Sequence, residues 1–128
     1  MATQDLKNRV TITQSMAPKA TLTAATNGTS VDMSGFEGCL VIYNIGVVAG
    51  APIVILQESD DDSTFTTVAA GDQSTTMPAA LSTSLDVTTY EAAYLGGKRY
   101  VRPRVSDEGT SIFIAVTIVQ SSGLHINA

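Results

Sequence analysis

Residues 52–68 constrain the fold of this chain more than any other segment. An apolar run, Pro-Ile-Val-Ile-Leu, is followed by an acidic polar stretch at residues 58–63 and then by a run of Thr, Phe and Val. Two such runs around a short polar stretch predict two β-strands joined by a short loop. Thr, Val and Ile together supply 38 of the 128 residues, and β-branched side chains favour strands over helices. The sequence therefore predicts an all-β protein.

Further short strand patterns are separated by turn residues. They lie at residues 10–12, 20–24, 36–48, 98–105 and 111–120. The pair Asn27-Gly28 is typical of a hairpin turn, and Gly38 and Gly46 predict bulges or close backbone approaches in their strand. Residues 69–89 are expected to form a long loop that contains one weak strand. About eight short strands favour an antiparallel β-sandwich or jelly roll.

Residues 98–105 form a strand pattern with two different faces. Val101, Pro103 and Val105 share one face, and Tyr and Arg side chains share the other. Pro103 has no N–H to donate to a neighbouring strand. We therefore expect this strand at a sheet edge or at a bulge.

The same segment concentrates four of the seven basic residues of the chain. They are Lys98, Arg99, Arg102 and Arg104, with Tyr100 between them. Exposed Tyr and Arg are enriched at interface hot spots, so these five residues are predicted to form a partner interface. The alternative is internal pairing with the acidic turn or with Asp107 and Glu108.

Residues 111–120 are apolar on both faces of a strand. Ile112, Ile114, Val116 and Ile118 share one face, and Phe113, Ala115 and Val119 share the other. Such a strand is buried on both sides, either as a central strand or against a neighbouring chain. Phe113 is therefore also predicted to contact a partner.

Composition limits the classes of partner. Only 15% of the residues are charged, against about 25% in typical soluble domains. This low value indicates either burial in an assembly or a surface rich in Thr and Ser. The net charge of −5 and a pI near 4.5 argue against a nucleic-acid partner, which requires a basic surface.

The length is that of one domain, which we expect at residues 10–120. Residues 1–9 are expected to form a polar N-terminal arm and residues 121–128 a polar tail. The N-terminus lacks the apolar stretch of a secretion signal, and no apolar run approaches the roughly 20 residues of a membrane span. The sequence predicts no membrane association.

Candidate catalytic and metal-binding residues are few. Cys39 is the only cysteine, lies in an apolar run, and is expected to be a buried, unreactive thiol. His125 is the only histidine and is close to the C-terminus. The acidic cluster at residues 58–62 lacks the spacing of a calcium-binding loop; a solvated turn, a Ca²⁺ site and pairing with the basic strand are its three interpretations. We expect no cofactor, no metal and no enzyme activity.

Two stretches resemble a known group of proteins. They are Leu-Gln-Glu-Ser-Asp-Asp-Asp-Ser-Thr-Phe at residues 56–65 and Tyr-Leu-Gly-Gly-Lys-Arg-Tyr-Val-Arg at residues 94–102. Both are similar to small proteins from the head-gene modules of tailed bacteriophages, some of which resemble capsid decoration or cement proteins. The resemblance covers mainly residues 52–105. These relatives often have Gly where this chain has Asp62, which leaves the geometry of the turn open.

The resemblance implies a β-sandwich protein of the virion that binds and stabilises the assembled head. It implies the major capsid protein as the partner, a homotrimer at three-fold positions, synthesis in the host cytoplasm and a location on the capsid surface. The alternative is a β-sandwich module of a head or tail fibre that binds a receptor or carbohydrate. The absence of Trp and the aromatic content of 5% count against a sugar-binding platform.

Overall fold

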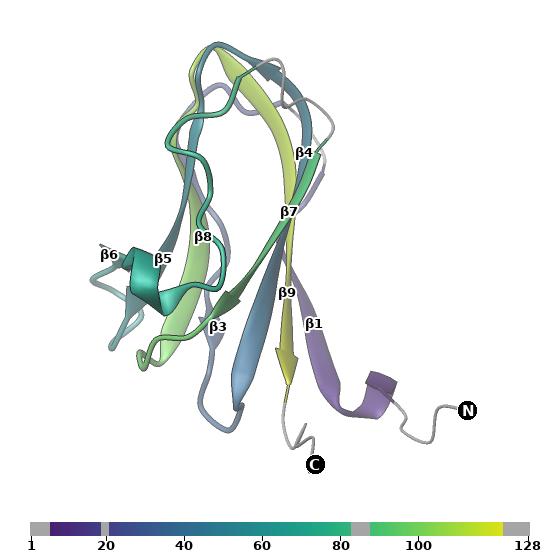
Figure 1. Cartoon of the computed structure of the whole chain (residues 1–128), viewed down its shortest axis with the longest axis vertical. Helices are drawn as coiled ribbons and strands as arrows, with labels where there is room; N and C mark the ends of the chain where they lie inside the picture. The colour runs from purple at the N-terminus through teal and green to yellow at the C-terminus, as the bar shows by residue number, and fades with distance from the viewer. Residues whose placement is uncertain (1–5, 19–20, 83–87, 122–128) are drawn as a thin grey trace.

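The computed structural model describes residues 6–18, 21–82 and 88–121, which form two antiparallel β-sheets packed face to face (Figure 1). The strands are β1 (Val10–Met16), β2 (Thr26–Asn27), β3 (Val31–Asp32), β4 (Gly38–Ala49), β5 (Ile53–Ser59), β6 (Thr66–Thr67), β7 (Thr88–Tyr94), β8 (Tyr100–Asp107) and β9 (Ser111–Ser121), with the 3-10 turns η1 (Leu6–Asn8) and η2 (Ala70–Asp72). One sheet, here the β9 sheet, has the order β1-β9-β4-β7. In the other, the β8 sheet, β8 pairs with β2 and β3 on one side and with β5 on the other, and β6 follows β5. The predicted β-sandwich is confirmed.

β9 is a central strand, between β1 and β4. Its inward side chains are almost completely buried: Ile112, Ile114, Val116 and Ile118 are at most 2% exposed. They belong to one core together with the inward residues of β4, including Tyr43. Burial of each such aliphatic side chain contributes roughly 1.5–3 kcal/mol. The prediction of a central strand is confirmed, whereas the outward side chains, among them Phe113, stay partly exposed.

Of the two settings predicted for Pro103, the sheet edge is wrong, because β8 is the central strand of its sheet, whereas a bulge-like irregularity is present, because the three residues 28–30 stand opposite the two residues 102–103. The carbonyl of Pro103 accepts a hydrogen bond from the N–H of Gly28 at 2.8 Å, so the ring nitrogen points to the same side. On that side residues 28–30 separate β2 from β3 and belong to neither strand. The missing N–H of Pro103 therefore faces an interruption in the neighbouring strand, which is why proline is tolerated here.

The expected hairpin and the bulge expected at Gly46 are both present, whereas Gly38 has neither a bulge nor a close backbone approach. β5 and β6 pair as the two strands of the predicted hairpin, through Gln57–Thr67 and Glu58–Thr66. The register between β4 and β9 shifts between Ile45 and Val48, where the sequence places Gly46. An extra residue at this point bends the long β4 strand.

The turn predicted at Asn27-Gly28 is not a hairpin turn. β2 and β3 flank it, but both pair with β8 and not with each other. The expected strand at residues 20–24 is reduced to a single bridge between Leu22 and Ile112, and its first residue lies outside the described part of the chain.

Three remaining segments are partly described. Of the loop expected at residues 69–89, the described part contains η2 and a bridge between Gln73 and Tyr94, but its last two residues, Thr88 and Thr89, already belong to β7. η1 lies in the expected N-terminal arm. The first five residues of that arm and the tail beyond Ser121 lie outside the described residues. Within the described ranges, no helix is long and apolar enough to span a membrane.

Candidate functional site

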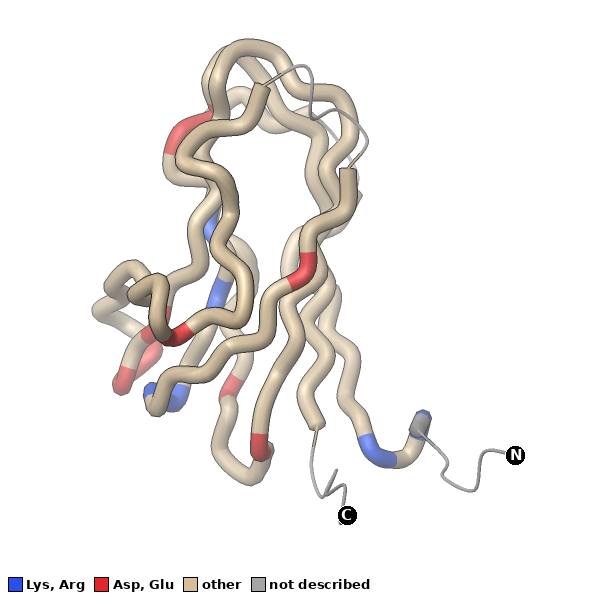
Figure 2. The backbone as a smooth tube through the Cα atoms, in the orientation of Figure 1, with Lys and Arg blue, Asp and Glu red and all other residues tan. Residues whose placement is uncertain are grey.

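The basic residues predicted as an interface fall into two groups with different surroundings. Lys98 and Arg99 end the loop between β7 and β8, beside the acidic turn that follows β5, and Figure 2 shows blue and red segments adjacent at this end of the molecule. The Nζ atom of Lys98 lies 2.7 Å from Oδ2 of Asp60. Arg99 donates two hydrogen bonds to Asp32, at 3.0 and 2.9 Å. Both cations are therefore paired within the chain.

The Asp32 carboxylate is held charged by these contacts. Its hydrogen bonds from Arg99 are the main reason that the pKa of Asp32 lies well below its usual range, and the backbone N–H of Ser34 adds to the effect. The Arg99 guanidinium also lies 5.1 Å from the ring centroid of Tyr100, within cation–π range. Tyr100 begins β8 and links this paired group to the strand.

Arg102 and Arg104 form the second group, on the outer face of the β8 sheet. The guanidinium of Arg102 stacks on the ring of Phe65, 3.8 Å from its centroid, and Nε donates to Gln57 at 2.9 Å. Arg104 donates a hydrogen bond to the side-chain oxygen of Asn27. Neither arginine forms an ion pair with any described residue. Partial burial, and then the nearby Arg104, lower the pKa of Arg102.

Among the described residues, the hydrogen-bond and stacking partners of these two arginines are neutral, although the charge of Asp62 lies near enough to Arg102 to favour its charged form. Stacking on Phe65 and the bond to Gln57 hold the Arg102 guanidinium in one place. An ordered guanidinium presents several N–H donors in a fixed plane, which suits the bidentate binding of a carboxylate. We call this surface, made by Arg102, Arg104, Phe65, Gln57 and Asn27, the arginine face.

Phe113 does not join the arginine face. It lies on β9 and points outward from the opposite sheet. There its side chain covers Gly46, where a Cβ atom would come within 3.0 Å of the Phe113 ring. The six residues predicted as one interface therefore occupy two opposite surfaces of the molecule.

The acidic turn is organised by its own side chains. The Asp61 carboxylate accepts hydrogen bonds from the backbone N–H groups of Thr64 and Ser63, at 2.9 and 3.0 Å, and from the Ser59 hydroxyl at 2.8 Å. These bonds lower the pKa of Asp61. Asp62 has φ of 60°, a left-handed conformation that favours glycine.

Of the three interpretations of the acidic cluster, the contacts favour pairing with the basic segment. Asp60 binds Lys98, and Glu58 accepts a 2.6 Å hydrogen bond from the Tyr94 hydroxyl. Among the described residues, no group of three His, Cys, Asp or Glu side chains is placed to hold a metal ion.

The candidates for chemical reactivity are buried or outside the described residues. Cys39 is 6% exposed, and burial raises the pKa of its thiol to about 11, so the buried thiol expected from sequence is confirmed. A neutral, buried thiol is a poor nucleophile. His125 lies beyond the described part of the chain.

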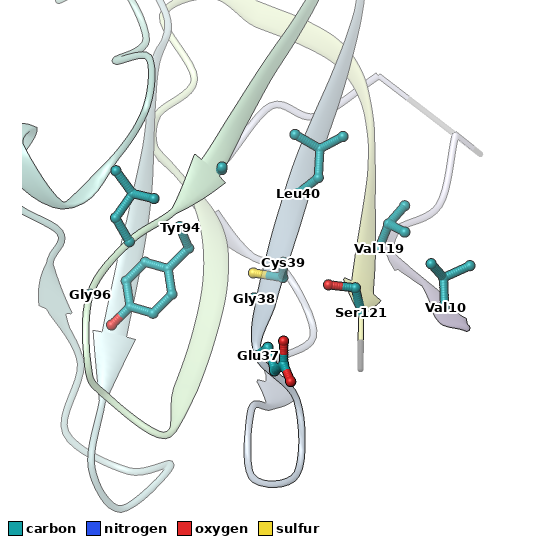
Figure 3. Close-up of a pocket in the computed structure, with 11 residues that line it drawn as sticks. Val10, Glu37, Gly38, Cys39, Leu40, Tyr94, Gly96, Val119 and Ser121 are labelled. Carbon is teal, nitrogen blue, oxygen red and sulfur yellow. The ribbon is translucent and has the colours of Figure 1, made fainter. Parts of the chain in front are cut away.

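An open pocket of about 590 Å³ lies at the end of the β9 sheet where β9 ends (Figure 3). Its walls are mainly aliphatic, with Val10, Leu40 and Val119 from three neighbouring strands. The Tyr94 ring lines one side, but its hydroxyl donates to Glu58. The pocket continues the outer face of the β9 sheet and has the chemistry of an apolar contact surface.

Several partners of the basic residues were not foreseen from sequence. Asp32 is 67 positions from Arg99, and Asn27 is 77 positions from Arg104, so only the pairing of β2 and β3 with β8 brings them together. Phe65 and Gln57 were within reach of sequence reasoning, because both belong to the predicted hairpin. Comparison with protein-family models, with curated proteins and with solved structures found no match.

Proposed function

We propose that this protein is a structural component of a tailed-bacteriophage virion, a decoration or cement protein that binds the assembled head through the arginine face. The resemblance at residues 52–105 supports the class of protein. The arginine face supports the surface that binds. The observation that carries the proposal is a contrast: Lys98 and Arg99 are paired with acids, whereas the hydrogen-bond and stacking partners of Arg102 and Arg104 among the described residues are neutral.

The proposed partner is the major capsid protein, through an acidic patch that reaches both arginines. Arg102 is already ordered by Phe65 and Gln57, so binding would cost little side-chain entropy. The chain as a whole carries a net charge of −5 and repels an acidic surface. The arginine face would therefore determine which side of the molecule docks.

The proposed role requires binding and no catalysis. A protein that binds the assembled head and not its separate subunits stabilises the head by mass action, in proportion to its affinity and concentration. Its location would be the capsid surface, after synthesis in the host cytoplasm. We also propose that it acts as a homo-oligomer on the head, for which the resemblance favours three copies.

Charge reversal of the arginine face tests the proposal. The double variant Arg102→Glu with Arg104→Glu is mixed with purified heads that lack the native protein, and binding is measured by co-sedimentation over a range of concentrations. Like charges would then face each other across the contact. We expect the dissociation constant to rise roughly thirtyfold or more, which corresponds to about 2 kcal/mol or more.

The matched control is the double variant Lys98→Glu with Arg99→Glu. It makes the same change in net charge but alters two residues that are paired within the chain. We expect a much smaller loss of binding, with a thermal melt of each variant to show that it is folded. Equal loss in both variants, or wild-type binding of the Arg102/Arg104 variant, would defeat the arginine face. Failure of the wild-type protein to bind heads would defeat the decoration role and favour a fibre module.

A further inference from the structure

The two sheets differ in how their edges are protected, and β1 is the exception. β7 is covered by backbone and side-chain hydrogen bonds from residues 72–74, at 2.7 to 3.0 Å, and carries Glu91. The edge strands of the β8 sheet, β2, β3 and β6, are two residues long. β1 is seven residues long and contains neither a charged residue nor proline, and Figure 1 shows it at the margin of its sheet. Long uncharged edges are templates for pairing with another chain.

The hydrogen-bond pattern shows which β1 groups point to the free side. Leu22 and Ile112 exchange two backbone hydrogen bonds, at 2.7 and 3.1 Å, so even-numbered residues of β9 direct their N–H and C=O groups toward the β1 side. Thr11 and Thr13 of β1 stand opposite even-numbered β9 residues and pair with them. The alternating residues of β1 therefore direct their N–H and C=O groups away from β9, and no described residue pairs with them. These residues are Val10, Ile12 and Gln14.

The β1 edge also exposes a large apolar side chain. Ile12 is 66% exposed, one of the most exposed large apolar side chains among the described residues. It stands beside Val119 of β9, which stands beside Leu40 of β4 and then Ala93 of β7. An apolar row thus crosses the outer face of the β9 sheet and ends, exposed, at the free edge.

We propose that β1 pairs antiparallel with β1 of a second copy of this chain, with Ile12 opposite Ile12. A two-fold axis perpendicular to the sheet relates the two β1 strands, and residues opposite each other then have their side chains on the same side of the sheet. Ile12 can therefore stand opposite Ile12 of the second copy, and Val10 then stands opposite Gln14. The outward-pointing backbone groups of all three residues are then used, with two hydrogen bonds at the central pair and two at each flanking pair. The two β9 sheets become one continuous sheet.

Side-chain chemistry favours a second copy as the occupant of this edge. In the proposed register the two Ile12 side chains meet, and the apolar row Ala93–Leu40–Val119–Ile12 continues into the same row of the partner. Like charges are not opposed, because Arg9 stands opposite position 15, a serine. The same surface therefore complements itself in backbone bonds, apolar contact and charge.

The proposed dimer forms from the isolated chain and does not depend on the binding of heads. A contact about a two-fold axis builds a dimer, in contrast to the trimer that the resemblance implies. Its test uses purified protein without heads, so that its failure leaves the decoration role untouched.

The first measurement is the molar mass by sedimentation equilibrium up to several hundred micromolar. We expect the wild-type chain, of 13.3 kDa, to approach twice that mass with increasing concentration. Ile12→Lys should raise the dissociation constant at least tenfold, because two ammonium groups would meet at the axis. Its melting temperature, measured where the protein is monomeric, should stay within a few degrees, since Ile12 is largely exposed.

Val47→Lys is the matched control. Val47 is also 66% exposed, but it lies in the β4 bulge and not on β1. This variant should associate as the wild type does. A chain that stays monomeric, an oligomer that Ile12→Lys leaves intact, or one that Val47→Lys disrupts equally would overturn the proposal.

Disulfide trapping tests the register. In a Cys39→Ala background, Ile12→Cys places two thiols on residues whose Cα atoms would be about 5.5 Å apart, within the range of a disulfide bond. We expect a cross-linked dimer on mild oxidation. Val10→Cys alone should cross-link poorly but should link to Gln14→Cys when the two variants are mixed. Equal cross-linking of Val10→Cys and Ile12→Cys on their own would contradict the proposed pairing.

Discussion

The β8 and β9 sheets both contribute to the core but expose different outer faces. The β8 sheet presents the arginine face, and all its edge strands are short. The β9 sheet presents an aliphatic row that ends at the long, uncharged edge of β1. The difference suggests two kinds of contact: an electrostatic one with an acidic partner and a backbone-mediated one with a second copy.

The contrast originates in two strand patterns. β8 alternates buried Val101 and Val105 with outward Arg102 and Arg104, so one face is apolar and the other is charged. β9 is apolar on both faces, although only its inward side chains are buried in the isolated chain. The outward side chains of β9 are only partly buried, and they include Val119 of the apolar row that leads to Ile12.

Side-chain truncations on the inward and outward faces of β9 should differ most in their effect on the free energy of unfolding. Ile118→Ala removes a side chain that is 0% exposed and should lower the free energy of unfolding by about 2–5 kcal/mol. Val119→Ala, on the outward face, should cost less than about 1 kcal/mol in the monomer. Denaturant unfolding of both variants at low protein concentration measures this. Similar costs at the two positions would mean that the outward face is already well packed within one chain.

A close contact at the interruption between β2 and β3 gives a test of the β8 sheet. A Cβ atom on Gly28 would lie 2.5 Å from Oγ of Ser15 and 2.6 Å from Cγ of Pro103. Gly28→Ala should therefore destabilise the fold by about 1–3 kcal/mol. Gly71→Ala is the control, because nothing lies within 4 Å of its Cβ position. If a thermal melt gave Gly28→Ala the same melting temperature as the wild type, Pro103 would not be held against this segment.

The loss of thermal stability in acid should come mainly from the acidic turn at residues 58–62, beside the β8 sheet. The folded-state pKa of Asp61 is lowered by the N–H groups of Thr64 and Ser63, so its stabilising contribution is present above its ordinary pKa of 3.8 and is lost as the pH falls below it. The wild type should melt a few degrees above Asp61→Asn at pH 7, and this gap should narrow as the pH falls below 3.8.

Asp60→Asn is the comparison for this acid effect. It removes the same charge from the same turn but breaks only one exposed ion pair, with Lys98, and such pairs contribute little. Its melting temperature should therefore differ from the wild type less than that of Asp61→Asn at pH 7. A gap for Asp61→Asn that stays constant from pH 7 to pH 3 would show that the carboxylate charge is not what stabilises the turn.

Local patterns were enough to predict the sandwich, the hairpin and the central position of β9. Each of these depends on alternation or turn chemistry within about ten to twenty residues. Pro103 was compatible with either a sheet edge or a bulge, and the choice depends on where the neighbouring strand is interrupted, at residues 28–30. That interruption is a property of the sheet and not of the segment that contains Pro103.

The candidate site was predictable only in part, for a related reason. The basic residues are adjacent in sequence, yet whether each is paired depends on acids and amides brought in by other strands. Asp32 neutralises Arg99, whereas Asn27 meets Arg104 without neutralising it. The separation of Phe113 from the basic residues follows from β8 and β9 belonging to different sheets.

The most direct test of the proposed role is an image reconstruction of phage heads that carry this protein. At a resolution that places strands, we predict the arginine face of the β8 sheet against the capsid surface, with Arg102 and Arg104 beside acidic residues of the major capsid protein. Absence of the protein from the heads would contradict the decoration role. Attachment through the outer face of the β9 sheet, with the arginine face exposed to solvent, would contradict the assignment of the two faces.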